Sequence, residues 1–337
     1  MATIKDVARR AGVAPSTVSY ALSGKRTISA QARERIAAVI DELDFTPSVL
    51  GRQLAHGKSN MIGLIYPVRD AEMAFEPLEF LPTAASLLQR CGFGLSLFTG
   101  AMSPAQILDL YRNNTIDGLI LMGINRQDER VEILRGKGYP LTLIGRCNDM
   151  AGYTSVDFDA EQAVFALFEH LHALGHHIIG YLDFIRQVHR DKFGYAWLLR
   201  RGLRRAQKAF APLVVCEEST DTARGSYAAT CRLLAREPRL TAIVTVTRLT
   251  PSGALRALYD HGRRVPEDCS LVGITTDAFA GLSLPQLTSA DIPLNDMVRV
   301  GAELVLAQIS GPSAPDGPQQ VIFPAMVVDR GSTAKPR

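Results

Sequence analysis

The chain has 337 residues, of which 47% are hydrophobic and 21% charged, a composition typical of a globular protein with two or three domains. No apolar run approaches the roughly 20 residues of a membrane-spanning helix, and the first residues contain no apolar stretch that would form a secretory signal. The five cysteines are widely spaced, which favours reduced thiols over a disulfide framework or a metal site. We therefore expect a cytoplasmic protein without a membrane partner.

The net charge of +3 is unevenly distributed. The first 60 residues carry nine Lys/Arg and five Asp/Glu, a charge of +4, whereas the rest of the chain has a charge of −1. A small basic head on a near-neutral body favours a polyanionic partner for the head. Charge alone leaves open a chance excess of basic residues.

Three helices are predicted in this head. The first begins in a capping box formed by Thr3 and Asp6, and it ends at Gly12, which can take a positive φ. The second begins near Pro15, a residue that suits the first helical position, and the third begins after the capping residue Ser29. Two short helices joined at a glycine and crossed by a third predict a helix-turn-helix unit, whose second helix lies in the DNA major groove.

The second helix carries small hydroxyl side chains and one aromatic side chain, with almost no charge. Small hydroxyls let a backbone approach phosphates and donate hydrogen bonds to them, and the helix N-terminus adds its own N–H groups. Tyr20 lies one turn into the helix, where a side chain can reach a base edge. The alternative that Tyr20 covers part of the small core stays open, although Val18, Ala21 and Leu22 already supply an inward face.

The N-terminal signature of the LacI/GalR family of transcriptional regulators is similar to one stretch of this chain, IKDVARRAGVAPSTVSYALSGKRTISAQARERIAAVIDELDFTPSVLGRQLAHGKSNMIGLIYP. The match runs without a gap from residue 3 to about residue 67. The resemblance implies a helix-turn-helix DNA-binding domain at 1–46 and a hinge helix with its linker at 47–60. It implies phosphate contacts at Thr17, Ser19 and Ser29, and base contacts at Pro15, Ser16 and Tyr20. The full set of expected DNA-binding residues is Thr3, Pro15, Ser16, Thr17, Ser19, Tyr20, Ser23, Ser29, Ser48, Gln53 and Leu54.

The hinge segment is too short to be a stable helix alone. The resemblance implies that it orders on DNA, pairs with a second hinge helix in the minor groove and wedges Leu54 between base pairs. An ordinary linker role for Leu54 is the alternative. Gly51 stands where alanine is usual, and Ala14 stands where a capping serine is usual, so both the hinge and the second helix should be harder to form.

From residue 61 onward, apolar runs alternate with helical stretches. This alternation predicts a doubly wound α/β architecture in which ligands bind beyond the carboxyl ends of buried parallel strands. The predicted strands are residues 61–67, 94–98, 118–122, 141–144, 178–182, 213–215, 242–246 and 271–274.

The family resemblance continues through this body. Its segments are SVDFDAEQAVFALFEHLHALGHHIIGYL, LTAIVTV, GALRALYDHGRRVPEDCSLVG and LPQLTSADIPLNDMVRVGAELVLAQISG. They imply an effector-binding and dimerisation domain at 61–337, with two periplasmic-binding-protein-like lobes that have parallel sheets and are crossed three times by the chain. We expect lobe 1 at about 61–160 and 291–323, and lobe 2 at about 161–290 and 324–337.

The expected effector cleft departs from the sugar-binding members of the family. Thr247 and Arg248 replace an Asn-Asp pair, and Thr276 precedes Asp277 where an Asp pair is usual. Fewer acceptors and more cationic donors favour an effector other than a neutral sugar, such as an anion that arginines could hold in two hydrogen bonds. The alternative, that Arg190 and Arg248 are surface residues, stays open. The expected effector-binding residues are Phe75, Arg146, Arg190, Thr247, Arg248, Thr276 and Asp277.

No motif for nucleotide binding, a serine nucleophile or a zinc hydrolase is present. We expect neither enzymatic activity nor a cofactor, and a structural role for His176 and His177. The predicted function is that of a sequence-specific transcriptional regulator, a repressor, that binds a pseudo-palindromic double-stranded DNA operator as a homodimer under the control of a small-molecule effector. The alternative is a cytoplasmic small-molecule-binding protein of the same fold without operator binding.

Overall fold

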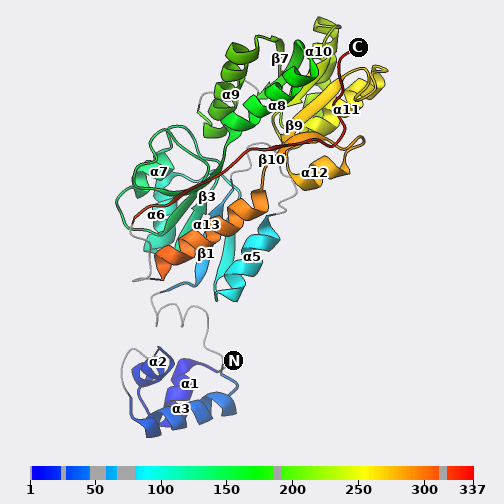
Figure 1. Ribbon diagram of the computed structural model, residues 1–337. Helices are drawn as coiled ribbons and strands as arrows, with labels where there is room; N and C mark the ends of the chain where they lie inside the picture. Colours follow the sequence, from blue (N-terminus) through cyan, green and yellow to red (C-terminus); the bar gives the residue numbers. More distant parts are fainter. Residues whose placement is uncertain (1, 24–27, 46–57, 67–79, 185–191, 311–316) are drawn as a thin grey trace.

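The computed structural model describes residues 2–23, 28–45, 58–66, 80–184, 192–310 and 317–337 (Figure 1). The chain forms a helical N-terminal domain, called the head here, and a body of two α/β lobes stacked one above the other. In the described part of the chain, no helix has the length and apolar character needed to cross a membrane.

The head contains α1 (Ile4–Ala11), α2 (Pro15–Ser23) and α3 (Ala30–Glu42). Local signals set these helices as predicted: Thr3 and Asp6 form both halves of a capping box, Gly12 ends α1 with a φ of 67°, and Ser29 accepts a hydrogen bond from the third residue of α3. The helices share one small core, made of Val7, Ala8, Ala11, Val18, Ile36, Val39 and Phe45.

Lobe 1 is built on a parallel six-stranded sheet in the order β11-β5-β4-β3-β1-β2. Its strands are β1 (Met61–Ile65), β2 (Gly94–Phe98), β3 (Gly118–Leu121), β4 (Leu141–Ile144), β5 (Thr154–Phe158) and β11 (Gln320–Phe323). Its helices are α5 (Leu81–Arg90), α6 (Pro104–Arg112), α7 (Glu129–Leu134) and α13 (Leu294–Ile309).

Lobe 2 repeats this plan with the strand order β12-β10-β9-β8-β6-β7, in which only β12 is antiparallel to its neighbour. Its strands are β6 (Ile178–Phe184), β7 (Leu213–Ser219), β8 (Ala242–Thr245), β9 (Ser270–Thr275), β10 (Thr288–Asp291) and β12 (Val327–Val328). Its helices are α8 (Ala160–Leu174), α9 (Gly194–Phe210), α10 (Ala223–Arg236), α11 (Thr250–Asp260) and α12 (Asp277–Leu282).

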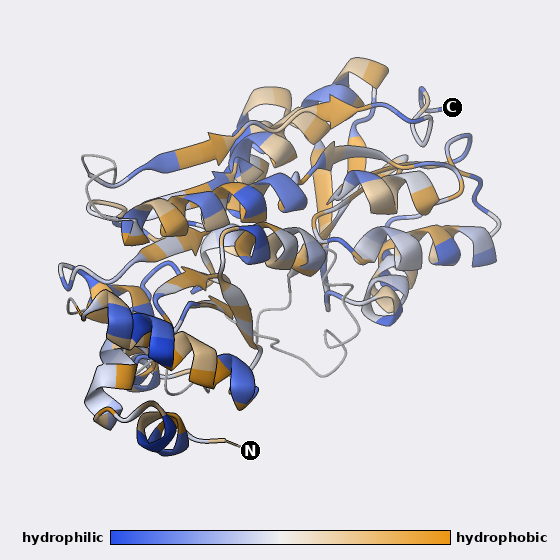
Figure 2. Cartoon of the chain, turned by 90° about the horizontal axis from the view of Figure 1, so that it is seen from below, coloured by the Kyte–Doolittle hydropathy of each residue, from blue (hydrophilic) through white to orange (hydrophobic). Residues whose placement is uncertain are grey.

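Helices cover both faces of each sheet, and this explains the nearly continuous apolar runs of the strands. In β1, Ile62 and Leu64 pack in one cluster with α5 and α13, whereas Ile65 packs in another with α6 and α7. In lobe 2, Val244 packs with α8 and α9, and its neighbour Ile243 packs with α10 and α11. Figure 2 shows the hydrophobic strands inside and hydrophilic helix turns outside.

The chain passes between the lobes three times, as the family resemblance implies: from β5 to α8, from β10 to α13 and from β11 to β12. The first and third crossings lie side by side, because the Asp159 N–H donates to the Phe323 carbonyl at 3.0 Å. The two-lobed α/β fold is thus confirmed. All eight predicted strands are present, β2 and β4 with the predicted ends and the other six with shifted ends, whereas β5, β10, β11 and β12 were not predicted.

His176 connects the C-terminal residues of the chain to lobe 2 through hydrogen bonds. Its Nδ1 lies 2.8 Å from the Thr241 hydroxyl, and its Nε2 lies 2.9 Å from the Ala334 carbonyl oxygen. Only an Nε2–H can donate to that carbonyl, so Nδ1 accepts from Thr241 when the ring is neutral. Burial lowers the pKa of His176, which favours the neutral form. Its role is structural, as predicted.

Candidate DNA-binding helix and inter-lobe cleft

The leading edge of α2 is exposed. Pro15 and Ser16 are exposed, and Thr17, Ser19 and Tyr20 are partly buried. The opposite side of α2 is anchored by Val18, which is fully buried in the head core (0% exposed). Ala21 and Leu22 of α2 pack against the same core, so the small side chains on the opposite side of the helix stand at the surface.

Ala14 precedes α2 and caps it with its backbone alone. Its carbonyl oxygen accepts from the Thr17 N–H at 2.8 Å and from the Val18 N–H at 3.3 Å. An alanine offers no side-chain oxygen to the free N–H groups of the first turn. Pro15 has no N–H and the Thr17 N–H is already bonded to Ala14, so among the first three helical residues the Ser16 N–H is the one that can meet a phosphate.

The other expected DNA contacts flank this helix. The exposed Thr3 hydroxyl donates to the Asp6 carboxylate at 2.7 Å, and the Thr3 N–H donates to it at 3.0 Å. These two hydrogen bonds lower the pKa of Asp6. Ser29 accepts from the Ala32 N–H at 3.2 Å, and Ser23 is the last residue of α2. The expected hinge contacts and the hinge glycine lie outside the described residues: Ser48, Gly51, Gln53 and Leu54.

Of the expected effector-binding residues in lobe 1, Arg146 follows β4 and forms an ion pair through Nε with Asp157 of β5. Burial raises the pKa of Asp157, and the adjacent guanidinium opposes that shift. Within the described residues, the buried Nη2 of Arg146 has no hydrogen-bond partner. Nη2 is therefore a donor available to a ligand. Phe75 and Arg190 lie outside the described residues.

In lobe 2, two of the expected residues contact other side chains of the same lobe. The Arg248 guanidinium lies 5.3 Å from the ring centroid of Phe279. Asp277, whose side chain is 85% exposed, accepts from Arg330 at 2.6 Å.

The other two expected residues of lobe 2 are buried threonines at the carboxyl ends of neighbouring strands. Thr247, after β8, donates to the Thr250 hydroxyl at 3.1 Å. Thr276, after β9, has a buried hydroxyl without a hydrogen-bond partner in the described part of the chain. That hydroxyl is a second polar group available to a ligand.

The sequence did not single out Tyr195 or Asp157. The Tyr195 hydroxyl, near the start of α9, donates to the Val246 carbonyl at 3.2 Å. Burial, followed by the nearby Asp221 and Asp157, raises the pKa of Tyr195, so its phenol stays protonated. The sequence shows Tyr195 only as an aromatic residue directly after Gly194, and Asp157 lies in β5, whose residues TSVDF form no apolar run.

The two lobes meet backbone to backbone beside these residues. The Gly194 N–H donates to the Ile124 carbonyl at 3.0 Å, and the Arg126 N–H donates to the Lys192 carbonyl at 2.5 Å. Gly194 is required here, because a Cβ atom at this position would lie 2.2 Å from the Arg146 carbonyl oxygen. The loop after β3 and the start of α9 thus form an inter-lobe contact through main-chain atoms.

Two family profiles match separate parts of the chain. Residues 3–48 match the profile described as bacterial regulatory proteins, lacI family, and residues 168–333 match the profile of a periplasmic binding protein-like domain. The first match covers all three helices of the head, and the second covers most of lobe 2 and α13.

Curated relatives match over nearly the full length. The HTH-type transcriptional regulator reg1 of Streptomyces lividans is 27% identical over 98% of this chain and 96% of its own length. The HTH-type transcriptional repressor PurR of Haemophilus influenzae is 26% identical over 86% of this chain and 85% of its own length.

Solved structures share the fold. The transcriptional regulator CelR in complex with cellobiose superimposes with a TM-score of 0.70 at 25% identity, covering 98% of this chain and 100% of its own. The lac repressor dimer bound to operator and the anti-inducer ONPF superimposes with a TM-score of 0.80 at 22% identity, covering 99% of both chains.

Proposed function

The chain belongs to the LacI family of bacterial regulatory proteins, and on this premise we propose that it is a repressor that binds a pseudo-palindromic operator as a homodimer in the cytoplasm. It is a DNA-binding transcriptional regulator and not an enzyme. In a two-fold symmetric dimer, each α2 enters one major-groove half-site, and the dimer geometry sets the half-site spacing.

The exposed leading edge of α2 carries this proposal. Pro15 and Ser16 stand free at the surface while Val18 is fully buried, so the helix presents small side chains to a groove and not to the protein core. Thr17 and Ser19 are placed to donate to phosphate oxygens, and Tyr20 to reach a base edge. We assign residues 1–46 to DNA binding, 47–60 to the hinge and 61–337 to effector binding and dimerisation.

We place the effector between the lobes, at the carboxyl ends of the strands. The Nη2 of Arg146 is a donor for a carboxylate or phosphate oxygen, and the hydroxyl of Thr276 is a second polar contact. A thermal-shift screen tests this assignment. Stabilisation by organic acids or phosphorylated metabolites supports an anionic effector, and stabilisation by neutral sugars alone contradicts it.

Selection of bound duplexes from a random DNA pool, with and without candidate metabolites, tests the regulator itself. We expect a two-fold symmetric sequence and an affinity that falls steeply with salt, because binding releases counterions from the phosphates. If no sequence is preferred over bulk competitor DNA, the protein is a small-molecule-binding protein of this fold without operator binding.

A further inference from the structure

Trp197, the single tryptophan of the chain, lies on α9 where two guanidinium groups approach its ring. The Cζ atom of Arg126 is 5.2 Å from the ring centroid, and that of Arg201 is 4.9 Å from it. Cations at these distances are attracted by the ring quadrupole. Arg201 belongs to α9 itself, whereas Arg126 comes from lobe 1, so only the Arg126 contact spans the two lobes.

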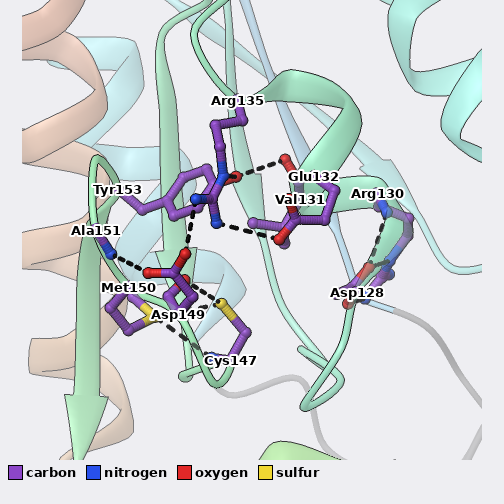
Figure 3. A network of polar contacts seen from close by, with 10 residues as sticks. All are labelled: Asp128, Arg130, Val131, Glu132, Arg135, Cys147, Asp149, Met150, Ala151 and Tyr153. Atoms are coloured by element: carbon purple, nitrogen blue, oxygen red, sulfur yellow. Dashed lines mark hydrogen bonds and ion pairs between the residues drawn. The ribbon is translucent and has the colours of Figure 1, made fainter.

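The Arg126 side chain is fixed from its own lobe. Its Nε donates to the Asn148 side-chain oxygen at 2.8 Å, and the Asn148 N–H donates back to the Arg126 carbonyl at 2.8 Å. Figure 3 shows how Arg135 braces the loop that contains Asn148, through an ion pair with Asp149 at 2.7 Å and a hydrogen bond to the Tyr153 hydroxyl at 2.9 Å. Arg126 is thus held in place by lobe 1 where it meets the indole.

The backbone beside Arg126 is fixed by Asp128. This carboxylate, 1% exposed, pairs with Arg130 at 2.6 Å (Figure 3). It also accepts from the Asn125 N–H at 2.9 Å. Arg130 also donates to the Gly123 carbonyl at 2.9 Å, which closes the turn. Burial raises the pKa of Asp128, but the hydrogen bonds and charge of Arg130 outweigh this effect, so the carboxyl stays ionised. The turn therefore presents the Ile124 carbonyl and the Arg126 N–H to lobe 2 already oriented.

We propose that these groups form an inter-lobe clasp, consisting of the backbone contacts of residues 124–126 with 192–194 and the Arg126 side chain on Trp197, which holds the lobes together and couples the cleft to the head. Arg126 is its positioning residue. The coupling rests on the proposed regulatory function, whereas the clasp itself does not.

Hydrogen exchange of the full-length protein tests the clasp without DNA or effector. In Arg126→Ala, peptides spanning 122–128 and 192–198 should exchange about 2- to 30-fold faster than in the unmodified protein, the range expected for loss of one cation–π contact. Arg201→Ala is the matched control, because it removes a guanidinium from the same ring without touching lobe 1. Its peptide 122–128 should exchange at the unmodified rate. Equal effects of the two variants, or no effect of Arg126→Ala, would overturn the clasp.

Coupling to the head is measured separately, with a duplex selected from random DNA by the unmodified protein. Arg126→Ala should change its Kd at least about twofold, the lower limit for loss of a cation–π contact, and Arg201→Ala should leave it unchanged. Faster exchange with an unchanged Kd would overturn the coupling. If no duplex is selected at all, the proposed function and the coupling both fail, and the exchange data still decide on the clasp.

Discussion

Replacing Gly194 by alanine tests the main-chain contact between the lobes directly. A Cβ atom there would lie 2.2 Å from the Arg146 carbonyl oxygen and 3.2 Å from that of Ile124. A carbon and an oxygen normally stay about 3.3 Å apart or more, so the backbones must separate by about 1 Å. Forcing one extra carbon into a packed site costs about 1–3 kcal/mol. We therefore expect Gly194→Ala to lower, by about 5- to 150-fold, the population of molecules in which residues 124–126 and 192–194 are in main-chain contact.

The assay combines hydrogen exchange with small-angle X-ray scattering of the full-length protein. Gly194→Ala should deprotect the peptides around residues 124–126 and 192–194, and its radius of gyration should increase as the lobes separate. Gly281→Ala is the control, because a Cβ there meets no atom within 4 Å. Should Gly194→Ala match the unmodified protein in both measurements, the close approach of the lobes in solution is refuted.

Four further changes probe the head, the hinge and lobe 2. Tyr20→Ala should relax base preference at one operator position, at a cost of about 1–3 kcal/mol, and unchanged selection from random DNA would contradict that role. Leu54→Ala should reduce operator bending. An unaltered bend angle in a gel-shift bending assay would show that Leu54 is not inserted between base pairs. Ala14→Ser should stabilise the head by about 1 kcal/mol in chemical denaturation by supplying the absent cap, with Ala14→Gly as its control. His176→Gln should flatten the fall in Tm between about pH 7.5 and 5.5. The pKa of His176 is lowered from 6.5 in the folded protein, so the unfolded chain binds the proton first as the pH falls. The stability that neutral His176 contributes above pH 6.5 is therefore lost as the pH falls below 6.5. An equal fall in Tm in His176→Gln and in the unmodified protein would contradict this.

Local sequence determined the helices of the head. A capping box, a glycine that takes a φ of 67° and a capping serine each act within about four residues, so their effects do not depend on the rest of the fold. The apolar runs also determined the central strands, because a strand covered by helices on both faces must be apolar throughout.

Only the tertiary structure decided the polar strands and the contacts between strand ends and between the lobes. The strand β10 contains buried Thr288 and Ser289, and its ladder is completed by distant groups such as the Ser332 hydroxyl, which accepts from the Thr288 N–H at 2.8 Å. The pairing of Arg146 with Asp157, and the placing of Arg126 on Trp197, depend on which strand ends and helix starts meet between the lobes. Such contacts join residues far apart in the chain, so their formation depends on strand order and on lobe packing, which no local pattern encodes.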